Sequence, residues 1–228
     1  MWVKICGNTN LEDTALAAEL GADAVGFVFA LSPRQVTAAQ VAAITAHLPS
    51  RVERVGVFDS RDAEEIATAA LEAGLTAVQL HGALDALLLE RLAERFAGHV
   101  RIIQVLHWNV DQAAGQLQSS APQLRGQIER VAALGIADRV LIDSKAGAAL
   151  GGTGVAFDWV TAREAFASAL GVRLIVAGGL NPDNVAVAVA QLLPWGVDVS
   201  SGVEQSPGRK DPTRVRQFIQ NARGAETP

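Results

Sequence analysis

The amino-acid sequence predicts an α/β fold, a single (β/α)8 (TIM) barrel that spans residues 1–228 as one domain. Two observations carry this prediction: eight short apolar runs alternate with helical patterns along the chain, and each run is too uniformly apolar for a strand with one solvated face. Strands of this kind are typical of parallel sheets that are buried on both sides. A length of 228 residues also suits eight strand–helix units closed into one barrel.

The predicted strands are spread along the whole chain. They are Trp2–Ile5, Ala24–Phe29, Arg54–Phe58, Ala77–Leu80, Val100–Leu106, Arg139–Ile142, Val172–Ala177 and Gly196–Val199. An open, doubly wound sheet would instead carry a G-x-G-x-x-G fingerprint after its first strand. The sequence there is Cys6-Gly7-Asn8-Thr9, which favours the closed barrel.

Capping residues mark several of the predicted helix starts. Thr9–Glu12 and Thr37–Gln40 have the spacing of capping boxes, in which a Thr and a Glu or Gln three residues later satisfy the first backbone N–H groups. Asn181-Pro182 and Asp211-Pro212 each combine an N-cap residue with a first-turn proline. The helices are expected to end near Gly21, His47, Gly74, Phe96, Leu134, Leu170, Leu193 and Ala222, and the segment Val110–Leu134 reads as only partly helical because it contains Pro122 and Gly126.

Composition narrows the classes of function. The formal net charge of −5 and the pI near 5.4 argue against nucleic acid or an anionic membrane as a partner. A single cysteine excludes an internal disulfide framework and fits a reducing compartment. No apolar run approaches the ~20 residues of a membrane span, and the first residues lack the apolar segment of a signal peptide. We therefore expect a soluble cytoplasmic protein.

The chemistry of a (β/α)8 barrel lies where its strands end at their carboxyl termini, and polar residues collect there. Asp143 follows an apolar run and precedes the glycine-rich Gly151–Gly154, although a surface loop capped by an aspartate is an alternative interpretation. Gly178-Gly179 and Ser200-Ser201-Gly202 follow the next two strands. Backbone N–H groups in such loops suit a phosphate, so three neighbouring loops predict a phosphate site.

Motifs along nearly the whole chain resemble those of the phosphoribosylanthranilate isomerase family of tryptophan biosynthesis. They are KICG at Lys4–Gly7, GADAVGFVF at Gly21–Phe29, SPR at Ser32–Arg34, VGVF at Val55–Phe58, VQLHG at Val78–Gly82, LIDS and GGTG around Asp143 and Gly152, AGGL at Ala177–Leu180, and VDVSSGVE at Val197–Glu204. KICG and the block from Asp143 through GGTG to FDW are the most specific of these.

The resemblance implies a role for particular residues. It assigns Cys6 as general base, Asp143 as general acid, and Arg34 as the contact of the anthranilate carboxylate. The residues that it places around the ribose phosphate are Gly152, Gly178, Gly179, Ser200 and Ser201. The implied reaction is the Amadori rearrangement of N-(5-phosphoribosyl)anthranilate into 1-(2-carboxyphenylamino)-1-deoxyribulose 5-phosphate, with no cofactor and no metal.

The residue types suit that reaction, which needs one acid and one base on either side of the sugar. Asp143 can act as an acid only if desolvation or nearby negative charge keeps it protonated, and Cys6 can act as a base only if the pKa of its thiol is held or lowered locally. Lys4 shares the face of Cys6 but is expected one layer deeper, so its role is open. His81 points to the same rim, where a substrate contact and a structural hydrogen bond are both open.

Other interpretations of these residues are available. Without the resemblance, Cys6 is also consistent with a small buried apolar side chain, and Arg34 is consistent with a solvated side chain in a turn. His47, His99 and His107 show no metal-ligand spacing, so no zinc site is predicted.

Two alternative functions keep the barrel. The first is the histidine-pathway aminoaldose isomerase, a family with two aspartates in these roles, whereas this chain has Cys6 at the end of its first strand. The lysine and glutamates that indole-glycerol-phosphate synthase would place in the barrel mouth are not seen in this sequence. A barrel that binds a phosphosugar without turnover is the alternative from another class. The expected partner is a phosphorylated small molecule, and both a monomer and a homodimer are compatible with the sequence.

Overall fold

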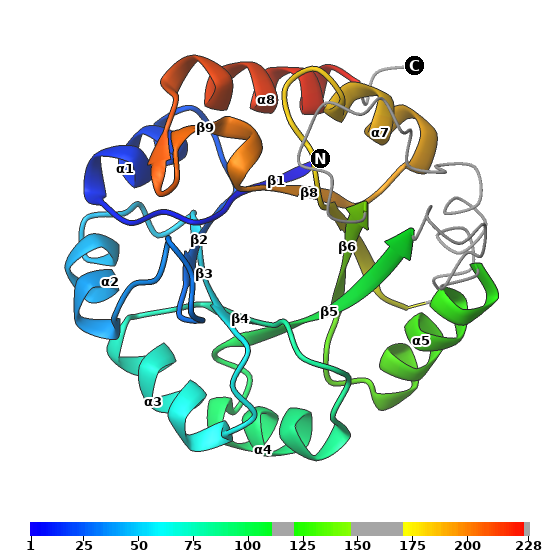
Figure 1. Cartoon of the computed structure of the whole chain (residues 1–228). Helices are drawn as coiled ribbons and strands as arrows, with labels where there is room; N and C mark the ends of the chain where they lie inside the picture. Colours follow the sequence, from blue (N-terminus) through cyan, green and yellow to red (C-terminus); the bar gives the residue numbers. More distant parts are fainter. Residues whose placement is uncertain (111–120, 147–170, 226–228) are drawn as a thin grey trace.

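The computed structural model describes residues 1–110, 121–146 and 171–225. Within these residues, eight parallel strands form a closed barrel in the order β1 to β8, and β8 pairs with β1 (Figure 1). The helices surround the strands on the outside of this ring, as Figure 1 shows. The predicted (β/α)8 barrel is therefore confirmed. The predicted helix up to Leu170 and the phosphate-site residue Gly152 lie outside the described residues.

The elements follow one another in strict alternation over most of the chain. The barrel strands are β1 (Trp2–Ile5), β2 (Ala24–Val28), β3 (Glu53–Phe58), β4 (Ala77–Leu80), β5 (Arg101–Val110), β6 (Arg139–Ala146), β7 (Arg173–Ala177) and β8 (Gly196–Val199). The helices are α1 (Leu11–Glu19), α2 (Ala38–Thr45), α3 (Ala63–Glu72), α4 (Ala86–Phe96), α5 (Ala121–Leu134), α7 (Val185–Leu192) and α8 (Pro212–Gly224). A single 3-10 turn, η1 (Ser201–Val203), follows β8 and leads into a two-stranded hairpin of β9 (Glu204–Ser206) and β10 (Arg209–Lys210).

The strands are buried on both faces because each successive side chain points to the opposite side of the sheet. One face packs against the helices in a large apolar cluster, and the other fills the barrel interior. The interior cluster consists of Ala24, Val55, Ala77, Ile103, Val105, Leu141, Ile175 and Ala177. This double burial is the reason why the strands read as uniformly apolar in the sequence.

A buried cation closes the amino-terminal end of the barrel. Arg139 is fully buried, and its Nη1 lies 2.6 Å from Oε2 of Glu53. Its guanidinium also lies over the rings of Trp2 and Trp195, 5.5 and 5.7 Å from their centroids. These side chains cover the packed interior cluster at the amino ends of the described strands.

Two of the predicted helix starts are confirmed. Thr37 forms a full capping box with Gln40, in which each side chain accepts a hydrogen bond from the other residue's backbone N–H. Asp211 caps α8 through hydrogen bonds from the backbone N–H groups of Thr213 and Arg214, and Pro212 occupies the first turn. Both starts depend on neighbouring residues alone, which is why the sequence predicts them.

The other two predicted starts are wrong in detail. Asn10, not Thr9, caps α1, because its side chain accepts from the backbone N–H of Asp13 while the Thr9 hydroxyl donates to the carbonyl of Gly208 at 2.8 Å. Helix α7 begins at Val185 rather than beside Pro182, since the Asn181 side chain first forms a tight turn. At α1 a contact with another part of the chain competes with the predicted cap, whereas at α7 a local turn delays the start of the helix.

Strands β5 and β6 extend beyond their predicted ends. Their parallel ladder continues past the pair His107 and Asp143 to the pair Val110 and Ala146. The predicted strand ends at Leu106 and Ile142 are therefore too early, and Asp143 lies within β6 rather than at its end. The extension carries polar residues, so it depends on backbone hydrogen bonds between the two strands and leaves no apolar pattern in the sequence.

No helix among the described residues is long and apolar enough to cross a membrane.

Candidate active site

The carboxyl ends of the strands bring the predicted site residues to one rim of the barrel. Cys6 directly follows β1, and its backbone N–H donates to the carbonyl of Val199 at 2.7 Å, which ties it to β8. Asp143 lies on β6 and is mostly buried, with 16% of its side chain exposed. Because β7 and β8 separate β6 from β1 in the ring, the proposed acid and base come from strands that are not neighbours.

A buried lysine lies directly beside the cysteine. Lys4 is fully buried, and its Nζ donates to Oε1 of Gln79 and to Oδ2 of Asp198, both at 3.0 Å. The same ammonium lies close enough to Cys6 for its charge to act on the thiol. Lys4, whose role the sequence leaves open, is therefore near enough to Cys6 to influence the pKa of its thiol.

Burial and charge act in opposite directions on the cysteine. Burial raises the pKa of the Cys6 thiol, the Lys4 ammonium opposes this, and the net result is a pKa above the ordinary value. For Lys4, burial lowers the pKa of the ammonium, but Asp198 and Cys6 together raise it above the usual value, so Lys4 stays charged. Contrary to expectation, the resting protein therefore holds Cys6 as a thiol beside a permanent positive charge.

These directions predict an alkaline titration of Cys6. The midpoint for thiolate formation should lie above the usual value of about 8.5, and Lys4→Met should move it higher, because the cation that lowers the pKa is removed. The thiolate can be followed by its ultraviolet absorbance, since the chain has one cysteine and no tyrosine that would titrate in the same range. Cys6→Ser is the blank. A midpoint below that of the unfolded protein would contradict this account.

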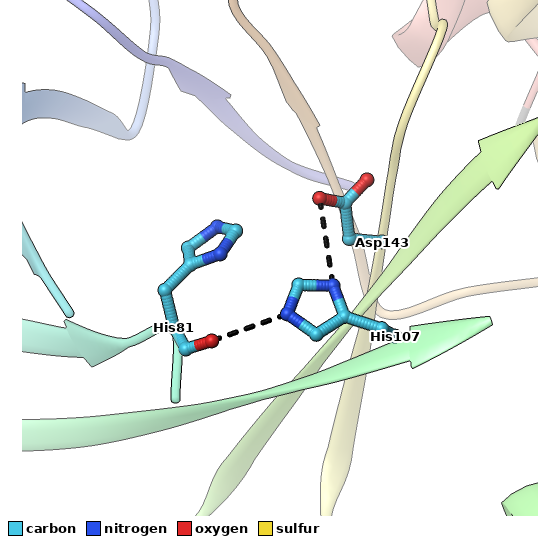
Figure 2. A group of neighbouring side chains, drawn as sticks. All are labelled: His81, His107 and Asp143. Atoms are coloured by element: carbon cyan, nitrogen blue, oxygen red, sulfur yellow. Dashed lines mark hydrogen bonds and ion pairs between the residues drawn. The ribbon is translucent and has the colours of Figure 1, made fainter. Parts of the chain in front are cut away.

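Two histidines lie beside Asp143, as Figure 2 shows. His107 on β5 is the register partner of Asp143, and its Nδ1 lies 3.9 Å from Oδ2 of that carboxylate. Its Nε2 lies 3.1 Å from the backbone carbonyl oxygen of His81, which follows β4. The two imidazole centroids are 5.2 Å apart. The sequence spacing of His107 did not indicate a functional site, because Asp143, which faces it, lies on the neighbouring strand β6.

Arg34 reaches the rim but is held by a second residue that the sequence did not single out. Its Nε donates to Oε1 of Glu204 at 2.8 Å, and its Nη2 donates to Oε2 at 2.5 Å. This hydrogen bonding raises the pKa of Arg34 further. The Arg34 side chain is 20% exposed and that of Glu204 only 4%, so the guanidinium is fixed from the buried side.

Lys210 at the end of the hairpin completes this group, which we call the hairpin clamp (Arg34, Glu204 and Lys210). Its fully buried Nζ donates to Oε1 of Glu204 at 2.9 Å, to the carbonyl of Cys6, and to the carbonyl of Ser200 at 3.4 Å. Burial lowers the pKa of Lys210, although Glu204 opposes the shift. Burial would raise the pKa of Glu204, but Arg34 and Lys210 lower it below its usual value. The clamp therefore joins the loops after β1, β2 and β8.

Glycine is required where these loops meet. Gly7 has φ +74°, and a Cβ there would lie 2.6 Å from Cδ of Arg34 and 2.7 Å from Oγ of Ser200. A Cβ at Gly202 would overlap the backbone carbonyl of Leu180, so the loops after β7 and β8 are in direct contact. Gly7, the glycine of KICG, thus lets the Arg34 side chain pass close to the backbone next to Cys6.

The predicted phosphate-site residues that the structure describes lie on these touching loops. Gly178 and Gly179 follow β7 with φ values of +89° and +66°, and a Cβ at Gly179 would meet no atom within 4 Å. Ser200 is half-buried and Ser201 is exposed, and both follow β8. The two loops thus form neighbouring stretches of backbone at the open end of the barrel.

Comparisons with known proteins agree with this geometry. Residues 3–221 match the family model described as N-(5'phosphoribosyl)anthranilate (PRA) isomerase. An N-(5'-phosphoribosyl)anthranilate isomerase from Geobacter sulfurreducens is 43% identical over 223 residues, covering 97% of this chain and 98% of that protein. One from Thermotoga neapolitana is 41% identical over 226 residues, with 97% and 98% coverage.

Solved structures show the same relationship. The crystal structure of phosphoribosyl anthranilate isomerase from Thermotoga maritima has a TM-score of 0.81 at 38% identity and covers 98% of this chain and 99% of that one. A complex of such an isomerase with reduced 1-(o-carboxyphenylamino)-1-deoxyribulose 5-phosphate has a TM-score of 0.75 at 36% identity, again with 98% and 99% coverage. A structure of monomers generated from the dimeric Thermotoga maritima enzyme has a TM-score of 0.77 at 36% identity, with the same coverage. By sequence and fold, this chain belongs to the N-(5'-phosphoribosyl)anthranilate isomerase family.

Proposed function

We propose that this protein isomerises N-(5-phosphoribosyl)anthranilate to 1-(2-carboxyphenylamino)-1-deoxyribulose 5-phosphate in tryptophan biosynthesis, with Asp143 as general acid and Cys6 as general base. Asp143 gives a proton to the ring oxygen, the bond from that oxygen to C1 breaks, and the nitrogen lone pair forms a protonated imine. Cys6 then removes the proton from C2, and the electrons of that C–H bond neutralise the imine as an enamine. Transfer of the enol proton to C1 completes the ketone. A proton then passes through solvent from the Cys6 thiol to the Asp143 carboxylate, which restores both groups, so atoms and charge balance with no external oxidant.

The observation that supports these roles best is the placement of Cys6 and Asp143 on non-neighbouring strands at one open rim. A sugar between them meets an acid on one side and a base on the other. The raised pKa of free Cys6 is compatible with this role, because the protonated imine adds a second positive charge to that of Lys4 and favours the thiolate.

The remaining groups bind the two ends of the substrate. The anthranilate carboxylate meets Arg34, whose Nη1 takes no part in the hydrogen bonds to Glu204. The ribose phosphate is held by backbone N–H groups of the loops that contain Gly178, Gly179, Ser200 and Ser201, and by the loop of Gly152, which lies outside the described residues. His81 contributes a substrate contact from the end of β4. The protein works in the cytoplasm, as a monomer or a homodimer.

A fluorescence assay on freshly made phosphoribosylanthranilate tests the proposal directly. We expect rapid conversion of this substrate and slower or no conversion of the histidine-pathway aminoaldose, because Cys6 occupies the place of an aspartate in that second arrangement. The reduced product analogue serves as a binding probe. Binding of the analogue without turnover would support the phosphosugar-binding alternative, and preference for the histidine-pathway substrate would support the other isomerase.

A further inference from the structure

Three side chains with metal-ligating atoms meet where β4, β5 and β6 reach the open rim (Figure 2). They belong to His81, His107 and Asp143, and one ligating atom of each lies within 4.8 Å of the other two. His107 and Asp143 are paired across the strands, and His81 follows the last residue of β4. One ligating side chain thus comes from each of β5 and β6, and the third comes from the residue that follows β4.

The tautomer of His107 is fixed by its surroundings. A backbone carbonyl can only accept a hydrogen bond, so the contact from Nε2 to the oxygen of His81 at 3.1 Å places the proton on Nε2. In the neutral ring, Nδ1 then carries a bare lone pair. This nitrogen is buried and makes no hydrogen bond with the described residues, and the Asp143 oxygen in front of it is 3.9 Å away, beyond hydrogen-bond distance.

A buried, unpartnered lone pair is costly unless a ligand fills the gap. Metal-binding histidines typically donate their second ring N–H to a carbonyl, which orients the ring and fixes the tautomer. His107 already has that arrangement. Two imidazoles and one carboxylate with an open fourth position also form a donor set typical of zinc-like ions, whereas Mg²⁺ and Ca²⁺ prefer oxygen ligands.

We propose that His81, His107 and Asp143 form a binding site for a divalent transition-metal ion of the zinc class. Ligands at about 2.0–2.1 Å from a tetrahedral ion lie roughly 3.3 Å from one another. The 3.9 Å gap between Nδ1 of His107 and Oδ2 of Asp143 closes to this value by small side-chain rotations, since both side chains are partly exposed. The backbone of the paired strands does not have to move.

Occupation of this site has a consequence for the proposed reaction. An ion bound to the carboxylate of Asp143 excludes the proton that a general acid must carry, so the metal inhibits turnover. This consequence depends on the proposed function, whereas metal binding itself does not.

Cobalt(II) added alone to the protein reports the site without any turnover, because its visible absorption bands are strong in tetrahedral coordination and weak in water. We expect saturable binding with these bands, and His107→Asn should weaken it by at least about tenfold. His99→Asn is the matched control, since His99 is exposed outside the cluster. Cys6→Ala should bind cobalt normally, and loss of binding in Cys6→Ala or unchanged binding in His107→Asn would overturn the site.

Inhibition is measured separately with zinc ions on the complete enzyme, and each variant is compared with its own metal-free rate. We expect zinc to inhibit the wild type, a chelator to reverse this, and His107→Asn to lose most of the sensitivity, while magnesium has no effect. Cobalt binding without zinc inhibition would support the metal site and contradict the role of Asp143 as acid. Zinc inhibition of equal strength in His107→Asn would count against the site.

Discussion

Asp143→Asn and Cys6→Ala should each lower kcat by roughly 10²- to 10⁴-fold, the usual contribution of a positioned acid or base. Asparagine keeps the shape of the aspartate but has no acidic proton for the ring oxygen, and alanine removes the sulfur that takes the proton from C2. Because neither residue is assigned to the carboxylate or phosphate ends of the substrate, binding of the reduced product analogue should persist. Steady-state fluorescence kinetics and calorimetric binding measure the two effects.

Asp138→Asn provides the matched control for the acid. Asp138 immediately precedes β6 at the opposite end of the barrel and is half exposed. Its carboxylate lies 3.6 Å from Nε of Arg139 and forms a surface pair with Arg173 at 3.5 Å. Surface pairs of this kind contribute little to stability, so turnover should stay unchanged. Full activity in Asp143→Asn or in Cys6→Ala would remove that residue from the mechanism while leaving the family assignment intact.

Lys210→Met is the substitution from which we expect the largest loss of stability, about 3–5 kcal/mol. The buried ammonium neutralises Glu204 and satisfies the carbonyls of Cys6 and Ser200, and methionine leaves all three without this partner. KM should also rise, because Arg34 is oriented through Glu204. Urea unfolding and steady-state kinetics measure both consequences.

The neighbouring Arg209→Met serves as the control for the clamp. Arg209 lies in the same strand, but its side chain is 46% exposed. Its Nε lies 3.7 Å from the buried Asp13, and its shorter ion pair, at 3.2 Å, is with Glu12, which is 81% exposed. Such a pair is worth at most about 1 kcal/mol. Equal destabilisation by the two substitutions would show that the hairpin matters as a whole and that the buried ammonium has no special role.

The sequence predicts the barrel and the proposed catalytic pair because both depend on strand order and burial. A strand that is buried on both faces must be apolar, and parallel strands all end at the same rim. Cys6 after β1 and Asp143 on β6 therefore lie at one opening as soon as the strands are placed in order. Local caps such as Thr37 are predicted equally well, since they involve only a few consecutive residues.

The surroundings of the catalytic pair depend on distant contacts, and the sequence does not predict them. His107 lies opposite Asp143 only because β5 and β6 pair beyond their apolar segments. The contact of Lys4 with Asp198 joins residues at the two ends of the barrel sequence. Glu204 and Lys210 flank Pro207-Gly208, a dipeptide typical of turns. That signal could have predicted the hairpin, but not that its two charges hold Arg34 and Cys6.

The closure of β8 onto β1 also determines when this enzyme becomes active during its synthesis. The surroundings of Cys6 are formed by Asp198, which is 194 residues from Lys4, and by Lys210, which is 204 residues from Cys6. A nascent chain therefore carries the proposed base Cys6 from the start but cannot surround it with Asp198 and Lys210 until almost the last strand has left the ribosome. Contacts of such long range form slowly. Until then Cys6 lacks the contacts that bury its thiol in the folded protein.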